Sequence, residues 1–211
     1  MIFSETKLRG AFIIDLEKKV DERGFFSRIF CQQEFEAHGL NAVLAQGNAA
    51  FSPKRGTLRG MHFQKAPFQE EKLIRCGRGA IYDVIIDLRK DSETCGQWVG
   101  AELTADNHRM IYVPKDFAHG YLTLLEDTEV LYFMTQFYRP ESESGVRYDD
   151  PAFQIEWPAS VPLSIVSEKD KNWPDFSLAQ VGPGSLPKEK MVGGREAALL
   201  KSGFCPRKED L

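Results

Sequence analysis

The chain has 211 residues, of which 42% are hydrophobic and 27% are charged. This length and composition are typical of a globular protein with a substantial core, and they do not indicate disorder. The formal net charge of −4 gives no reason to expect binding to nucleic acid.

Four cysteines are scattered along the chain without C-x-x-C spacing. This pattern predicts free thiols in a reducing compartment and supports neither a zinc site nor a disulfide framework. The N-terminus lacks the features of a signal peptide, and no apolar run approaches the ~20 residues that a membrane helix needs. We therefore expect a cytoplasmic protein that does not engage a membrane.

Short strands separated by glycine-containing turns dominate the first 150 residues. Residues 32–38 predict the one clear helix, with Gly39 at the position where helices commonly end. Residues 73–89 are rich in β-branched side chains and are interrupted by Gly77 and Gly79, which predicts a β-hairpin. Further strands are predicted over 97–103 and 110–113. Another is predicted over 129–138 from its alternating side chains, with Val130, Tyr132 and Met134 on one face. Many strands with little helix favour a sandwich or a jelly roll.

Beyond Asp150 the pattern changes. The segments 155–158 and 167–170 are expected to pack back onto the strands. The tail is rich in proline and glycine, apart from a short helix predicted over 195–201. We therefore expect one β-rich domain over residues 1–176 and a loosely ordered or partly helical extension over 177–211.

The segment G-T-L-R-G-M-H-F-Q at residues 56–64, followed by Lys72, brings a guanidinium, an imidazole and an ammonium close together. Such a set can remove a proton and stabilise the resulting oxyanion. In strict strand alternation Arg59 and His62 would face opposite sides of the strand. We therefore predict an irregularity at Gly60 that turns both side chains into one pocket.

Further motifs follow over residues 5–176: D-E-R-G-F-F (21–26), Q-G-N (46–48), E-K-L-I-R-C (71–76), D-V-I-I-D-L-R (83–89), P-K-D-F-A-H-G-Y (114–121), Tyr132 with Y-R-P (138–140), D-D-P (149–151) and S-E-K-D (167–170). Together with G-T-L-R-G-M-H-F-Q they resemble the dTDP-4-dehydrorhamnose 3,5-epimerase (RmlC-like) family of nucleotide-sugar epimerases. The resemblance implies a mainly β, cupin-type double-stranded β-helix, or jelly roll, with short peripheral helices. It also implies a homodimer that exchanges N-terminal strands.

The activity implied by the resemblance is inversion of C3, C5 or both beside the 4-keto group of a nucleotide-linked 4-keto-6-deoxy sugar. The family needs neither metal nor cofactor and serves deoxysugar biosynthesis, such as that of lipopolysaccharide O-antigens. The ketone acidifies the neighbouring C–H bond, so the reaction needs a base, an acid on the opposite face, and a positive charge for the enolate oxygen.

His62 is the expected base, because a free imidazole titrates at about pH 6.5. The resemblance points to Asp170 as the carboxylate that orients it. Tyr132 is the expected acid, since a phenol keeps its proton up to about pH 10. Lys72 is the expected partner of the enolate oxygen. Tyr132 also fits a simpler interpretation, as an aromatic side chain that lines the barrel.

The substrate-binding residues implied by the resemblance are Arg23, Phe26, Arg28, Gln46, Asn48, Arg59, His119 and Tyr138. Guanidinium groups suit phosphate oxygens because they donate two parallel hydrogen bonds. If strands are exchanged, Arg23 and Phe26 reach the nucleotide of the neighbouring subunit. Tyr138 can stack on the base, and His119 shapes the pocket or binds substrate.

Arg28 departs from the family pattern, which commonly has glutamate at this position. Glutamate can accept the N3–H of thymine, whereas arginine only donates and suits ring acceptors such as those of cytosine. We therefore hypothesise a nucleotide other than dTDP, such as CDP. The alternative is that Arg28 points to solvent or pairs with a phosphate.

Three further functions are compatible with the sequence. A metal-dependent cupin usually gathers two or three histidines and a carboxylate, but here only His62 and His119 are plausible ligands and Gly60 stands where a further histidine is expected. Asp83 and Asp87 flank a buried-looking run and are interpreted as structural. The second function is that of a keto-sugar isomerase of the same fold, and the third is that of a non-catalytic sugar-binding cupin.

Overall fold

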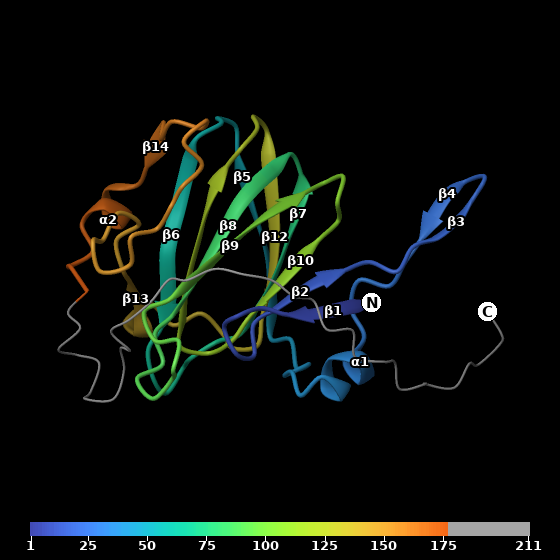
Figure 1. Ribbon diagram of the computed structural model, residues 1–211, viewed down its shortest axis with the longest axis horizontal. Coiled ribbons are helices and arrows are strands. Elements are labelled where there is room, and N and C mark those ends of the chain that lie inside the picture. Colours follow the sequence, from blue (N-terminus) through green and yellow to red (C-terminus); the bar gives the residue numbers. More distant parts are fainter. Residues whose placement is uncertain (177–211) are drawn as a thin grey trace, which may run out of the picture.

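The computed structural model describes residues 1–176, which form two facing β-sheets (Figure 1). The first sheet has the strand order β1 (Ile2–Glu5), β2 (Phe12–Asp15), β10 (Met110–Val113), β7 (Lys72–Arg78), β12 (Thr128–Met134) and β5 (Gln46–Ser52). The second has the order β13 (Glu143–Gly145), β6 (Thr57–Gln64), β11 (Phe117–Thr123), β8 (Ala80–Asp87) and β9 (Trp98–Thr104), with β14 (Ile165–Val166) beside β6. The prediction of a mainly β, cupin-type jelly roll is confirmed.

The main core lies between the two sheets. Ile74 of β7 and Val130 of β12 come from the first sheet, and Ile81 and Ile85 of β8 come from the second. All four side chains are almost completely buried. Burial of apolar side chains such as these contributes roughly 2 kcal/mol each and is the main contribution to the stability of the sandwich. The core closes one end of the sandwich, and a cavity occupies the other part of the space between the sheets.

The prediction of a hairpin over residues 73–89 is wrong. Strands do form on both sides of Gly79, but β7 pairs with β10 and β12, whereas β8 pairs with β9 and β11. The chain therefore crosses from one sheet to the other at Gly79, whose φ of +78° is one that glycine adopts readily. Strand propensity identifies the two strands, but their sheet partners depend on distant segments.

The outer faces of both sheets are covered. Helix α1 (Gln32–Ala37) packs Phe35 against the first sheet. The predicted helix is confirmed, with Gly39 following it at a φ of +71°. Residues 146–176 run over the second sheet, where Trp157 and Phe176 pack on its apolar cluster. The predicted return of this C-terminal segment onto the strands is thus confirmed.

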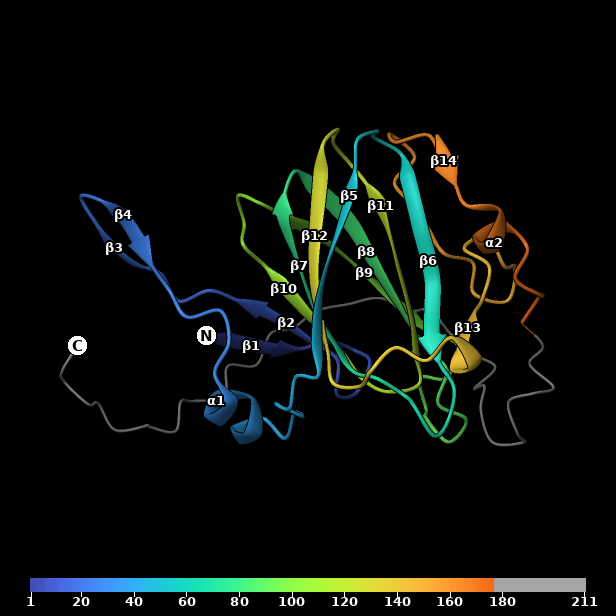
Figure 2. The same cartoon turned by 180° about the vertical axis from the view of Figure 1, so that it is seen from behind.

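The segment around residues 19–26 projects from the body of the molecule. Strands β3 (Lys19–Asp21) and β4 (Gly24–Phe26) form a separate two-stranded hairpin. Figures 1 and 2 show it extending well beyond the two sheets, on the side away from β6 and α2 (Glu168–Lys171). Val20 and Phe26 on this hairpin are 76% and 73% exposed.

Within residues 1–176, no helix combines the length and apolar character needed to cross a membrane. The extension predicted over 177–211, with its short helix over 195–201, lies outside the described residues.

Candidate active site

A cavity of about 600 Å³ lies between the two sheets and is lined by residues of β5 from the first sheet and β6 from the second. Both strands are labelled in Figure 2. All four residues expected to be catalytic line it: His62, Lys72, Tyr132 and Asp170. Five of the expected binding residues line it as well: Gln46, Asn48, Arg59, His119 and Tyr138. Residues that are far apart in the sequence, on β5, β6, β7, β11, β12 and α2, therefore meet in one place.

The irregularity predicted at Gly60 is present. His119 of β11 pairs with His62, but Tyr121, two residues further on, pairs with Arg59, three residues back on β6. The extra residue on β6 brings Arg59 and His62 to the same side of the strand, and both line the cavity. A side chain at residue 60 would not fit, because a Cβ would lie 2.5 Å from the Cα of Gly120.

His62 and Asp170 form a close pair in the wall of the cavity. The Nε2 atom of His62 lies 2.6 Å from Oδ1 of Asp170, which is 3% exposed. The amide of Gly60 donates to the other carboxylate oxygen at 3.3 Å. Burial raises the pKa of Asp170, but the hydrogen bonds from His62 and Gly60 outweigh it and hold that pKa below its usual value. Asp170 is therefore ionised at neutral pH.

Asp170 reaches His62 because of a short helical turn. The side chain of Ser167 accepts a hydrogen bond from the amide of Asp170 at 3.1 Å and so begins α2 as its N-cap. Strand β14 pairs with β6 immediately before this turn and fixes its position. Trp173 beyond the helix packs edge-on to His62, with the ring centroids 6.4 Å apart.

Lys72 lies at the start of β7 with its ammonium in the cavity wall. Nζ donates to the backbone carbonyl of His62 at 3.0 Å and contacts Oε1 of Glu70 at 3.0 Å. The Lys72 side chain is 9% exposed. A buried ammonium of this kind interacts strongly with negative charge that develops beside it, because little water screens the interaction.

Tyr132 comes from β12, in the sheet opposite His62. The predicted alternation holds, since Val130, Tyr132 and Met134 face inward, while Phe133 packs on the outer cluster. Burial raises the pKa of Tyr132, although the charge of Arg59 counteracts part of that rise. The phenol therefore stays protonated around neutral pH and can act as a proton donor.

The rim of the cavity carries a linked polar network. The Tyr138 hydroxyl donates to Oε2 of Glu143 at 2.8 Å, and Lys169 forms an ion pair with the other oxygen of Glu143. Burial raises the pKa of Glu143, but its hydrogen bonds with Lys169 and Tyr138 outweigh this and hold it below its usual value. The main-chain amide of Tyr138 donates to Gln46, which anchors the rim to β5.

His119 and Asp83 form a second pair deeper in the second sheet. Nε2 of His119 lies 2.8 Å from Oδ2 of Asp83, and Asp83 is completely buried. Burial raises the pKa of Asp83, with His119 and Lys72 acting in the opposite direction. Asp83 thus has a structural role, as predicted, because it holds His119, which lines the cavity. Asp87 has a separate role, in binding Arg89, Ser92 and Thr94.

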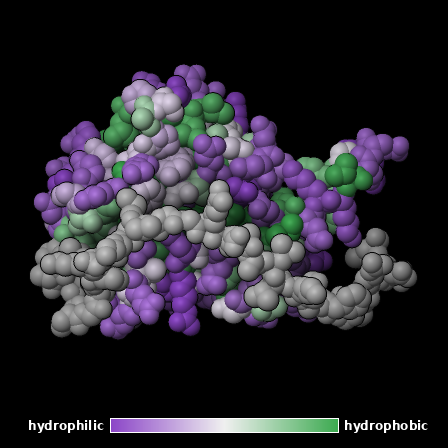
Figure 3. All heavy atoms as spheres, viewed as in Figure 1, coloured by the Kyte–Doolittle hydropathy of each residue, from purple (hydrophilic) through white to green (hydrophobic). Residues whose placement is uncertain are grey.

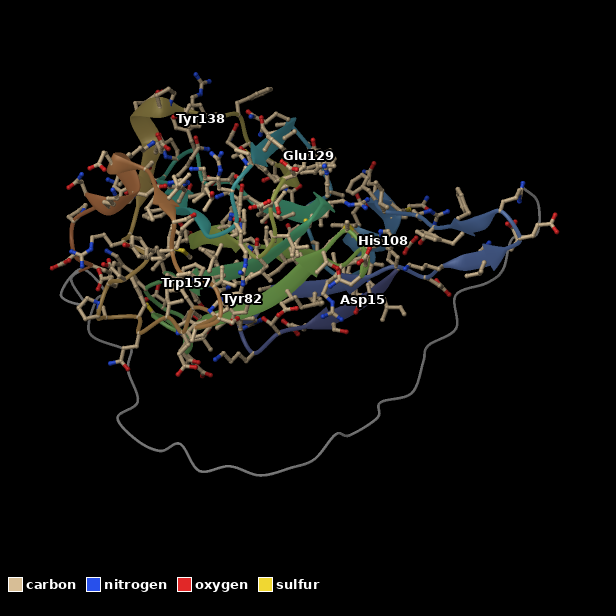
Figure 4. All side chains as sticks on the ribbon, turned by 90° about the horizontal axis from the view of Figure 1, so that it is seen from above. Asp15, Tyr82, His108, Glu129, Tyr138 and Trp157 are labelled. Atoms are coloured by element: carbon tan, nitrogen blue, oxygen red, sulfur yellow. The ribbon has the colours of Figure 1, made fainter. Side chains whose placement is uncertain are left out.

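Arg23, Phe26 and Arg28 do not line the cavity of their own chain. Arg23 and Phe26 lie on the projecting hairpin, and Figure 4 shows Tyr138 at the opposite end of the molecule from that hairpin. Arg28 pairs with Glu34 of α1, with Nη1 and Oε1 2.6 Å apart, and its side chain is 60% exposed, so within this chain it lies at the surface and not in the cavity. Within one chain, these three residues therefore lie apart from the residues that line the cavity.

Sequence reasoning missed several residues that line the cavity. These are chiefly Gln64, Glu70, Tyr121, Glu143, Ser167 and Lys169. Gln64, Ser167 and Lys169 belong to the motifs at 56–64 and 167–170, so their position next to His62 or Asp170 was the available signal. Glu70 and Glu143 carry no such signal, because Glu70 reaches the cavity from the loop between β6 and β7, and Glu143 reaches it through the pairing of β13 with β6.

The side chains around the cavity do not form a metal site. Among residues 1–176, no three His, Cys, Asp or Glu side chains come together in a way that could hold a metal ion. Each histidine of the cavity instead contacts a single carboxylate, Asp170 for His62 and Asp83 for His119. This donor set gives no support to the metal-dependent alternative.

Comparison with known proteins gives consistent matches over the whole of the described region. Residues 5–177 match the family described as dTDP-4-dehydrorhamnose 3,5-epimerase. The chain is 45% identical over 172 residues to the protein of that name from Methanothermobacter thermautotrophicus, covering 81% of this chain and 92% of the relative.

Solved structures agree with the sequence comparison. The dTDP-4-dehydrorhamnose 3,5-epimerase from Bacillus anthracis, solved with TDP and PPi bound, is 42% identical with a TM-score of 0.78, over 83% of this chain and 99% of the other. ChmJ, a 3′-monoepimerase from Streptomyces bikiniensis solved with dTDP-quinovose, is 31% identical with a TM-score of 0.74, over 81% and 85% of the two chains.

Proposed function

Because the chain belongs to the dTDP-4-dehydrorhamnose 3,5-epimerase family, we propose that it inverts C3, C5 or both of a nucleotide-linked 4-keto-6-deoxy sugar through an enolate. The observation that carries this proposal is the pairing of His62 with a buried, ionised Asp170 in a cavity that also contains Tyr132 and Lys72. Together these residues offer a base, an acid and a positive charge.

His62 removes the proton beside the ketone. Asp170 accepts a hydrogen bond from Nε2 of His62, so the neutral ring carries its proton there and keeps the lone pair of Nδ1 for the incoming proton. Once protonated, the imidazolium is stabilised by the negative charge of Asp170. A positioned base of this kind contributes roughly 10²–10⁴-fold to the rate.

Tyr132 returns a proton from the opposite face. It lies on β12 of the first sheet, whereas His62 lies on β6 of the second, so a sugar ring between the sheets has one of them on each side. Inversion requires this geometry, because removal and return of the proton from the same face would restore the original configuration.

Lys72 stabilises the enolate oxygen. Its ammonium is held in the cavity wall by Glu70 and by the carbonyl of His62, close to the strand that supplies the base. Arg59, Gln46 and Asn48 are then left to contact the diphosphate. Tyr138 lines the cavity at its rim, and in this proposal it stacks on the base of the nucleotide. Arg59 already donates to Ser52 and to the carbonyl of Phe51, which orients its guanidinium.

The active molecule is proposed to be a homodimer in which N-terminal segments are exchanged. The hairpin β3–β4 exposes Val20, Phe25 and Phe26, and Figure 3 shows apolar side chains gathered on it beyond the main body. Exposed apolar groups on a projecting hairpin are costly in water unless another surface covers them. Placed against a second copy, the hairpin carries Arg23 and Phe26 toward the nucleotide of that copy.

The nucleotide is proposed to be dTDP or CDP. The relatives are named for dTDP-linked substrates. Arg28, which stands where the family commonly has glutamate, is the reason to retain CDP. One nitrogen of Arg28 is paired with Glu34, and a guanidinium has further N–H donors that can contact a base. Cytoplasmic location and a role in lipopolysaccharide O-antigen biosynthesis remain predictions.

Solvent exchange tests the proposed function directly. The metal-stripped protein is incubated in D₂O with dTDP-linked and CDP-linked 4-keto-6-deoxy sugars, and C3 and C5 are followed by NMR. Deuterium entering at one or both carbons with inverted configuration is the expected result. The labelled position identifies the regiochemistry, and the faster substrate identifies the nucleotide. A clear preference for dTDP ends the hypothesis about Arg28.

Different outcomes of the same experiment would redirect the assignment. Movement of the carbonyl without inversion indicates a keto-sugar isomerase. Binding without exchange indicates a sugar-binding protein without catalytic activity, and exchange only after metal is restored indicates a metal-dependent enzyme.

A further inference from the structure

Glu70 is a buried carboxylate in the cavity wall that has no role in the proton transfers of His62 and Tyr132. It lies on the loop between β6 and β7, two residues before Lys72. Its side chain is 3% exposed, and it lines the same cavity as His62 and Lys72. Carboxylates are rarely buried to this extent unless they are paired with an opposite charge.

The contacts of Glu70 connect it to both the base and the cation. Oε1 lies 3.0 Å from Nζ of Lys72. Oε2 accepts a hydrogen bond from the backbone amide of Gln64 at 3.1 Å, at the end of the strand that carries His62. Lys72 in turn donates to the carbonyl of His62. The carboxylate and the ammonium are therefore fixed to the same short stretch of β6.

The ammonium of Lys72 has more N–H donors than its contacts with Glu70 and His62 use. An ammonium group has three protons to donate. The carbonyl of His62 accepts one of them, the carboxylate of Glu70 lies 3.0 Å from the nitrogen as an ion-pair partner, and no further acceptor is found among residues 1–176. The other buried carboxylate near Lys72 is Asp83, and it is bound by His119. Glu70 is thus the carboxylate among residues 1–176 that pairs directly with this ammonium.

We propose that Glu70 is a positioning residue for the reaction, which holds the Lys72 ammonium so that its third proton faces the enolate oxygen. This inference rests on the proposed function, in which Lys72 acts on that oxygen. The contribution of Glu70 appears when charge develops on the substrate and not when the substrate first binds. Correct placement of one donor at a developing oxyanion commonly changes rates by about 10²–10³-fold.

The test is the variant Glu70→Gln, which keeps the size of the side chain and removes its charge. We expect kcat for inversion to fall about ten- to a hundredfold, while KM changes less than about threefold, because the affected interaction forms in the transition state. Glu71→Gln is the matched control. Glu71 is the adjacent carboxylate, it does not line the cavity, and it lies beside Tyr112 of the outer cluster.

A second pair of variants separates positioning from a purely structural role. In a Lys72→Gln background, Glu70→Gln should cause no further loss of kcat, because the group that it positions is already absent. Additive losses would overturn the inference. Glu70→Asp keeps the charge and shortens the side chain, so it should retain part of the activity even if Glu70→Gln does not fold.

The outcomes also separate this inference from the proposed function. If the wild-type protein inverts the sugar and Glu70→Gln does so with an unchanged kcat, the role of Glu70 is wrong and the proposed function stands. Wild-type protein that neither exchanges deuterium nor inverts the sugar overturns the proposed function and this inference with it.

Discussion

At the scale of single residues, the site depends on one histidine and the carboxylate that holds it. The Nε2 atom of His62 is fixed 2.6 Å from Asp170, and Asp170 is fixed in turn by the amide of Gly60 and by the N-cap of Ser167. A free imidazole would rotate among several orientations, and fixing it in advance is a substantial part of what a catalytic site supplies. We therefore expect the pair to contribute both to catalysis and to stability.

The pH dependence of stability follows from the lowered pKa of Asp170. Because this pKa lies below the ordinary value of 3.8, the pair stabilises the fold above about pH 4, and that contribution is lost as the pH falls through the folded-state pKa. Urea unfolding of wild type and Asp170→Asn should show a stability gap at pH 7 that narrows below pH ~4. A gap that stays constant down to pH ~3 would contradict the assignment.

The proton donor can be tested separately from the base. In Tyr132→Phe, His62 can still remove a proton and return it to the same face. We therefore expect deuterium to enter the substrate from D₂O while inversion falls by about 10²-fold or more. NMR of the recovered sugar measures both quantities in one sample.

His62→Asn provides the comparison for that experiment, because without the base neither exchange nor inversion should proceed. Inversion by Tyr132→Phe at the wild-type rate would assign the donor role to another group and leave Tyr132 as an aromatic residue that lines the barrel.

At the scale of elements, the irregularity in β6 decides which side chains reach the cavity. Regular alternation would place Arg59 and His62 on opposite faces. The extra residue at Gly60, with φ at +120°, brings them to the same side. The need for glycine is steric as well as conformational, since a Cβ would meet the Cα of Gly120 at 2.5 Å and the carbonyl of His119 at 2.7 Å.

Gly60→Ala should therefore lower the free energy of unfolding by about 2–4 kcal/mol and reduce activity, because β6 must shift away from β11. Gly39→Ala is the control, since Gly39 also has a positive φ but has open space around the position of a Cβ. That variant should cost about 1 kcal/mol and keep its activity. Chemical unfolding and the NMR assay provide the measurements, and equal effects of the two variants would contradict the steric account.

At the scale of the whole molecule, the arrangement of Arg23 relative to the cavity predicts a shared active site. Co-expression with two tags allows purification of a dimer that combines one Arg23→Ala subunit with one His62→Asn subunit. If Arg23 acts across the interface, one cavity of this dimer has both residues intact, so about half of the wild-type activity should remain.

The reciprocal dimer is the control. It pairs a wild-type subunit with a subunit that carries both substitutions. If Arg23 acts across the interface, each cavity of this dimer then lacks either Arg23 or His62. Activity should then be lost, whereas a cavity that uses its own Arg23 would give the opposite result in both dimers. A monomeric protein with full activity would contradict the exchanged dimer.

Several elements of the fold and part of the site could be predicted from the sequence, because the physical signals for them are local. Alternating side chains in 129–138 identified a strand and the residues that share each face, although the strand ends at Met134, and Gly39 marked the end of a helix. The spacing of Arg59 and His62 around Gly60 even predicted the irregularity, since only a break in the alternation brings both side chains into one cavity.

The sequence did not predict which distant segments pair with each other, because such pairing depends on the assembled fold. The strands on either side of Gly79 were identified, but not their separation into different sheets, because partners such as β10 and β12 lie 30 residues or more along the chain. The pairing of Asp83 with His119, 36 residues along the chain, is equally non-local. Glu70 and Lys72 are close in the sequence, but their burial against β6 depends on how strands and loops pack around the cavity. Burial then sets the charge and orientation of these groups, and burial is a property of the assembled fold.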